Sequence, residues 1–193
     1  STTNLATVST SMNDKGARTR VLNKILRHAL KHSAKTLHKR LPSFVKQYYA
    51  HLAIAELEDA EPENLAKLAL HHLKGAITRK RKTPLVRVFN PATEKEGWLG
   101  GHTVIEIVSD DMPFLVDSIT AEVNRRGYAV HLAVHPVLRV RRNKTGKLTE
   151  IVDPGTLGQD KDVCFESFLH LQIDEQPDVR SEEHTSELQS HHD

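Results

Sequence analysis

The segment 104–130 constrains the fold of this chain more than any other. An apolar, strand-like run leads into Asp110 and Asp111, either of which can cap a helix N-terminus, and Pro113 suits a first helical turn because its missing N–H costs nothing there. Gly127 suits the left-handed residue that ends a helix. Between them, four apolar residues recur at helical spacing: Leu115, Val116, Ile119 and Val123. The segment therefore predicts a strand, a helix that begins near Pro113 and a second strand.

Strand patterns also occur on both sides of this unit. They cover residues 85–89, 102–108, 147–152 and 165–173, and a longer run alternates strictly over 128–140. The alternation places seven residues on one face: Tyr128, Val130, Leu132, Val134, Pro136, Leu138 and Val140. Pro136 cannot donate to a ladder, so we expect an edge position or a bulge there. The residues 143–146 predict a hairpin turn with Gly146 at positive φ.

Helical patterns fill the region before the first strand. Residues 15–40 contain nine Lys and Arg and no acid, with apolar residues at helical spacing, which predicts a basic amphipathic helix. Its basic face fits a solvated docking helix, but also a nucleic-acid patch, a membrane-surface helix or an organelle presequence. Two further helices are expected, one after Pro42 and one from Pro62. The fold class is therefore α+β, with about three helices followed by an antiparallel sheet.

These patterns divide the chain into four parts. Residues 1–14 are rich in Ser, Thr and Asn without a period, and we expect them to be disordered. A helical segment (15–82) and a sheet domain (83–179) follow. The tail 180–193 resembles the translation of a sequencing adapter, which we interpret as read-through, with a disordered polar tail as the alternative. The single cysteine, Cys164, and the lack of long apolar runs predict a cytoplasmic chain without a membrane segment.

The residues give no set for catalysis, cofactor binding or metal binding. Neither Gly100-Gly101 nor the pair Gly155 and Gly158 has the spacing of a phosphate-binding loop, and no Ser, His and Asp arrangement stands out. Cys164 lacks a local motif and is expected to be a packed side chain. We therefore predict a binding or structural module.

Two histidine pairs are candidate metal ligands. His28 and His32 have a helical spacing that can chelate zinc, but no acid or cysteine is near them in sequence. His131 and His135 lie about 13 Å apart on one strand, too far to share an ion. Only a cross-strand partner such as His170 can complete a site there. We therefore predict no metal site.

The central stretch resembles an ACT domain, the small βαββαβ regulatory fold of amino-acid metabolism. Eight positions carry the resemblance: Asp111, Pro113, Leu115, Val116, Ile119, Val123, Gly127 and Val130. The resemblance implies an effector loop formed by Asp110, Asp111, Pro113 and Phe114. The sequence departs from the pattern at Phe114, where ligand-binding members have a glycine that lets the backbone approach a bound amino acid.

A closer resemblance covers roughly residues 42–174. Six blocks carry it: 44–49, 86–91, 110–118, 124–127, 135–142 and 166–168. They resemble the N-terminal region of the large bacterial NAD-specific glutamate dehydrogenases. The resemblance implies an oligomeric parent that oxidatively deaminates L-glutamate with NAD, and whose catalytic and NAD-binding residues lie outside this chain. The sheet domain then lacks the last helix and strand of its βαββαβ unit, and the expected partners are other domains and subunits of the same enzyme.

Two roles follow for such a fragment without dehydrogenase activity. In one it is a structural module that packs against other domains. In the other it is a stand-alone or built-in amino-acid sensor that uses the effector loop. A nucleic-acid-binding protein that uses the basic helix is a third possibility.

Overall fold

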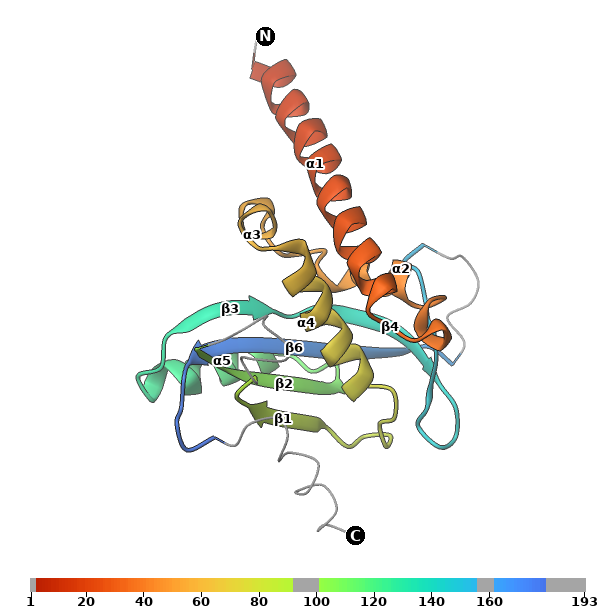
Figure 1. Ribbon diagram of the computed structural model, residues 1–193, viewed down its shortest axis with the longest axis vertical. Helices are drawn as coiled ribbons and strands as arrows, with labels where there is room; N and C mark the ends of the chain where they lie inside the picture. The colour runs from red at the N-terminus through yellow and green to blue at the C-terminus, as the bar shows by residue number, and fades with distance from the viewer. Residues whose placement is uncertain (1–2, 92–100, 156–161, 180–193) are drawn as a thin grey trace.

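A computed structural model describes residues 3–91, 101–155 and 162–179 of the chain, and within them helices precede and cover a sheet (Figure 1). The helical elements are α1 (Thr3–Lys31), the 3-10 helix η1 (Lys35–Leu37), α2 (Leu41–Tyr48), α3 (Ile54–Asp59), α4 (Pro62–Gly75) and α5 (Leu115–Arg125). The strands are β1 (Leu85–Phe89), β2 (His102–Asp110), β3 (Val130–Val134), β4 (Val137–Arg142), β5 (Leu148–Ile151) and β6 (Cys164–Asp174). The predicted α+β class is confirmed.

The six described strands form one antiparallel sheet in the order β1-β2-β6-β4-β5, and β3 also pairs with β6. β3 and β4 follow each other along the same edge of β6, because the chain is interrupted between Val134 and Val137. Pro136 lies in this interruption, where it does not have to donate to the ladder, and its carbonyl accepts a hydrogen bond from the Phe168 amide at 3.0 Å. The irregularity expected near Pro136 is therefore present.

Two apolar layers hold the sheet. On one face, α1, α2 and α4 share a core with strand residues that include Val108, Leu138 and Phe168. On the opposite face, α5 packs through Val123 against Leu169 and other residues of β2 and β6. The helical segment and the sheet thus share one core. Burying apolar surface on both faces is what holds a sheet of this size together.

The structure differs from the sequence prediction in three helical regions. Residues 3–14 are helical and lengthen α1, because extending an existing helix adds one hydrogen bond for each residue that is fixed. The expected second helix is divided into α2 and α3 by a turn after Tyr48. The helix expected near Pro113 begins at Leu115, two residues later.

The prediction that the apolar residues of the long strand share one face is also wrong for the first of them. Tyr128 and Val130 pack on the α5 side of the sheet, whereas Leu132 and Val134 pack on the side of the N-terminal helices. A register shift between Val130 and Leu132 causes the change, since one extra residue moves every later side chain to the other face.

The hairpin turn is present, with Gly146 at φ 85°. The glycines of the loop 97–100, Gly158 and the tail 180–193 lie outside the described residues. Among the described helices, none is both long and apolar enough to cross a membrane.

Candidate effector loop

The loop between β2 and α5 carries the residues predicted to bind an effector. Its last residue, Phe114, precedes α5 and has φ 63°, a left-handed conformation that is unfavourable for a phenylalanine. Its carbonyl accepts a hydrogen bond from the Ser118 amide at 2.9 Å, which starts the helix. No side chain caps α5, so the expected capping by Asp110 or Asp111 is wrong. Both aspartates are too far back in the chain, because α5 begins only at Leu115.

Asp110 is held by an ion pair at the base of this loop. Its Oδ1 accepts a hydrogen bond from Arg79 Nη2 at 2.5 Å, and Arg79 comes from the connection between α4 and β1. This carboxylate is therefore engaged, although 48% of its side chain is exposed. Asp111 is exposed, and its backbone amide donates to the Phe165 carbonyl at 3.0 Å. Asp111 therefore differs from Asp110, because its side chain faces solvent and has no ion pair among the described residues.

A buried charge cluster lies under Asp110. Arg79 also donates to Glu166 Oε2 at 2.9 Å, and Arg142 donates to the same carboxylate from β4. Burial alone lowers the pKa of Arg79, but the hydrogen bonds to Asp110 and Glu166 outweigh burial and raise it. Two guanidinium groups thus face two carboxylates. The cluster fixes the base of the loop to β4 and β6.

Phe114 and Met112 are the outward-facing residues of the loop. Phe114 is 77% exposed and Met112 is 53% exposed. At Phe114, where the ACT pattern has glycine, the backbone therefore has a conformation that glycine favours. The phenyl group of Phe114 extends from this position into solvent. Effector binding by Asp110, Asp111, Pro113 and Phe114 stays a prediction.

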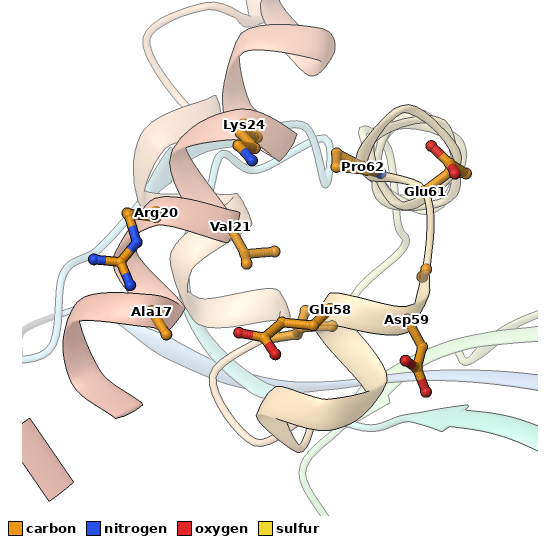
Figure 2. A pocket seen from close by; sticks show the side chains of 10 residues that line it. Ala17, Arg20, Val21, Lys24, Glu58, Asp59, Glu61 and Pro62 are labelled. Atoms are coloured by element: carbon orange, nitrogen blue, oxygen red, sulfur yellow. The ribbon is translucent and has the colours of Figure 1, made fainter. Parts of the chain in front are cut away.

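A pocket of about 350 Å³ lies elsewhere, between α1 and the α3–α4 segment (Figure 2). Arg20 and Lys24 line it from α1, and the acidic side chains come from the other wall: Glu58, Asp59 and Glu61. Basic residues of α1 and acidic residues of the α3–α4 segment therefore line the same pocket.

Arg18, another residue of the basic helix, donates to the carbonyls of Tyr49 at 3.0 Å and Leu52 at 2.7 Å. These carbonyls follow α2, where helix ends leave acceptors without partners. Together with the charges across the pocket, these contacts support the docking interpretation of α1.

Among the described residues, His170 belongs to a group of potential metal ligands that includes neither His131 nor His135. His131 contacts Asp174, with Nε2 2.6 Å from Oδ1, and its hydrogen bond lowers the pKa of that carboxyl. His170 is buried under α4, whereas His131 is exposed on β3. An acid does lie beside the helical pair, because Glu63 Oε1 is 3.1 Å from His32 Nε2. Glu63 comes from α4, so no local sequence signal could reveal it.

The single cysteine does not take part in any described site. Cys164 is a free, half-buried residue at the start of β6, and it packs against the core shared with the N-terminal helices.

The family model for the glutamate dehydrogenase ACT1 domain matches residues 44–189. The NAD-specific glutamate dehydrogenase of Pseudomonas aeruginosa is 40% identical over 139 residues, which is 70% of this chain and 8% of the relative. That of Halomonas elongata is 34% identical over 134 residues, 68% of this chain and 8% of the relative. No solved structure matches the chain.

The chain thus spans about 8% of the length of the curated relatives it matches. The family match runs ten residues beyond Val179, into the segment that we interpret as read-through, and that interpretation stays a prediction. The matched range includes both the β2–α5 loop and the whole described sheet. The chain belongs to the ACT1-domain family of glutamate dehydrogenases.

Proposed function

We propose that this chain is part of the N-terminal region of a large cytoplasmic NAD-specific glutamate dehydrogenase, and that it has a structural role there. The parent converts L-glutamate, NAD and water to 2-oxoglutarate, ammonia and NADH. The names of the two relatives support this activity, and the small share of each relative that is matched supports a chain that contributes neither catalytic nor NAD-binding residues. The isolated chain is then expected to form no NADH from L-glutamate and NAD.

One observation carries the structural role. The sheet face that bears α5 has four large apolar side chains that are exposed beyond the helix: Val86 (57%), Val88 (42%), Val137 (45%) and Phe165 (48%). Val86 and Val88 come from β1, whereas Phe165 and Val137 come from β6 and β4. We call these four residues the apolar sheet patch. Exposed apolar groups on one face favour contact with other protein surface, so the patch fits another domain or subunit of the same oligomeric enzyme.

The test uses the full-length parent enzyme. Val86→Asp combined with Phe165→Asp places two charges on the apolar sheet patch. We expect a smaller oligomer, or a lower midpoint of thermal unfolding, together with lower dehydrogenase activity. Light scattering after size-exclusion chromatography measures the mass. Lys144→Asp, in the exposed hairpin turn, is the matched control. If the double variant keeps the mass, midpoint and activity of this control, the structural role is wrong.

The second candidate function is amino-acid sensing by the β2–α5 loop. The observation in its favour is the left-handed backbone at Phe114, the conformation that glycine favours. Titration calorimetry of the parent enzyme against a panel of amino acids tests it. Saturable binding that is lost in Asp111→Ala and retained in Asp117→Ala supports the sensor. An absence of heat for every amino acid leaves the structural role as the better account.

A further inference from the structure

A group of polar residues lies buried between α4 and the sheet, away from the loop and from the apolar sheet patch. His72 of α4 is 2% exposed, Glu106 of β2 is 3% exposed and His170 of β6 is 0% exposed. Glu106 and His170 are direct cross-strand partners, and α4 places His72 above them. One ligand atom from each of the three residues lies within 4.8 Å of the others. Three elements thus bring three metal-ligating side chains to one buried point.

Two polar atoms of this group lack hydrogen bonds. Oε2 of Glu106 and Nδ1 of His170 are buried without a hydrogen-bond partner. Oε1 of Glu106 is engaged, because Nδ1 of His71 lies 2.7 Å and Nη1 of Arg87 lies 4.0 Å from it. A buried carboxylate with an unsatisfied oxygen is costly, so such atoms point to a ligand that is held there.

The chemistry of the three side chains also suits a metal. Two imidazoles and one carboxylate meet at this point, and these groups bind metal ions as neutral imidazole and ionised carboxylate.

The neighbours of both histidines also hold the rings in place. His72 Nε2 donates to the Ile107 carbonyl at 3.1 Å, which leaves Nδ1 as the nitrogen with a lone pair. Nδ1 accepts a hydrogen bond from the Tyr48 hydroxyl at 2.7 Å, which a metal bond at Nδ1 would replace. The amide nitrogen of Gln172 lies 3.1 Å from Nε2 of His170 and donates to it, which fixes the orientation of the ring. Such outer contacts are typical of metal-binding histidines.

We propose that His72, Glu106 and His170 bind one zinc ion that joins α4 to β2 and β6. Two imidazoles and one carboxylate form a donor set that zinc uses in proteins. Tetrahedral zinc needs ligand atoms about 3.3 Å apart, so the side chains have to close by at most about 1.5 Å. A cavity of about 10 Å³ beside His72 and Glu106 has room for one water as a fourth ligand.

A second group, His28, His32 and Glu63, also has ligand atoms within 4.8 Å of one another. It is more exposed than the buried group, and His32 already pairs with Glu63. We therefore assign the ion to the buried group. The experiment has to distinguish the two groups, and the variant His32→Gln does so.

The test uses the full 193-residue chain, purified without an affinity tag, stripped with a chelator and then dialysed against zinc. Mass spectrometry of the elements measures bound zinc, and thermal unfolding measures stability with and without it. We expect about one zinc per chain and a midpoint that rises by several degrees in wild type and in His32→Gln. His170→Gln and Glu106→Gln lose both the zinc and the rise.

Three outcomes overturn the proposal. If wild type retains less than about a tenth of an equivalent of zinc and its midpoint of thermal unfolding is unchanged, no tight site exists. Loss of zinc in His32→Gln with retention in His170→Gln places the ion at the exposed group. If His170→Gln does not fold, X-ray absorption at the zinc edge of His32→Gln decides. A shell with two imidazoles supports the buried site, and a shell of oxygens alone contradicts it.

Discussion

Arg142 and Glu166 form a bidentate ion pair between β4 and β6, with Nε 2.8 Å from Oε2 and Nη2 2.9 Å from Oε1. Glu166 is fully buried and also accepts from Arg79, so one carboxylate compensates two guanidinium groups. Glu166→Gln keeps the shape and removes the charge. We expect the free energy of unfolding to fall by about 3–5 kcal/mol, because Arg142 loses its carboxylate and Arg79 keeps only the half-exposed Asp110. Urea denaturation measures the change.

The matched control for this variant is a second Arg–Glu pair on the same sheet. Arg141 Nη1 lies 2.7 Å from Glu150 Oε2, but 51% of the Glu150 side chain is exposed. Glu150→Gln is expected to cost less than about 1 kcal/mol, since exposed pairs are worth little. Equal losses for the two variants would show that burial does not set the strength of the Glu166 cluster.

Gly146 predicts a large effect of a single methyl group. It has φ 85°, and a Cβ there would lie 2.2 Å from the Arg79 carbonyl oxygen, which is backbone and cannot move away easily. Gly146→Ala therefore combines left-handed strain with a steric clash, and we expect a loss of more than about 3 kcal/mol in urea denaturation. Gly127 has φ 81° with nothing within 4 Å of a Cβ. Gly127→Ala should cost only the strain, about 1 kcal/mol. A similar cost for both contradicts the clash.

Phe114 predicts the opposite effect of a glycine. Phe114→Gly relieves the left-handed strain and removes a side chain that is 77% exposed, so the free energy of unfolding should stay equal or rise by up to about 1 kcal/mol. Met112, which is 53% exposed and lacks a positive φ, is the control. Met112→Gly should lower stability by about 0.5–1 kcal/mol. A clear destabilisation by Phe114→Gly would mean that the phenyl group makes a stabilising contact.

The buried histidines predict a loss of stability in acid. Burial lowers the pKa of His72 and of His170, the latter to about 3, whereas an unfolded histidine titrates near 6.5. Below pH 6.5 the unfolded chain therefore binds more protons than the folded chain. The free energy of unfolding then decreases as the pH is lowered. Each histidine adds a slope of up to about 1.4 kcal/mol per pH unit, and neither adds a slope above pH 6.5.

Urea midpoints between pH 7.5 and 5, in the presence of a chelator, measure this slope. His170→Gln should lose part of it, and His51→Gln, at an exposed position, should retain all of it. The ion pairs of Glu106 are not involved in this window, because a carboxylate whose pKa is lowered loses its contribution only below about pH 4.5. An unchanged slope in His170→Gln would show that this ring is protonated in the folded protein.

Local patterns predicted most of the elements. The strand 85–89 has the predicted limits, and the final strand differs from its prediction by one residue at each end, because β-branched and apolar residues end there at turn-forming residues. The positive φ of Gly146 was also predicted from a local pattern, the turn-forming residues 143–146. The start of α5 was not, since the left-handed Phe114 contradicts the preference of its residue type.

The contacts between distant elements could not be predicted. His71 and His72 meet Glu106 and His170 only because α4 docks on the sheet with β2 and β6 in a particular register, which no local pattern encodes. The same holds for Arg79, which precedes its partner Glu166 by 87 residues. The shift at His131 reversed the expected faces for a similar reason, because one inserted residue leaves the alternation of residue types intact.

The position of β1 limits how the sheet can be extended. In a βαββαβ unit the last strand pairs with the first, but here Leu85–Phe89 lies against β2 in that place, and β6 fills the other side of β2. Both edges of β2 are therefore taken before the chain reaches residue 175. A strand that follows Asp174 can join at the outer edge of β1, of β3 or of β5, or it must displace β1. An insertion of further domains after β6 thus leaves the hydrogen bonds of the central strands intact.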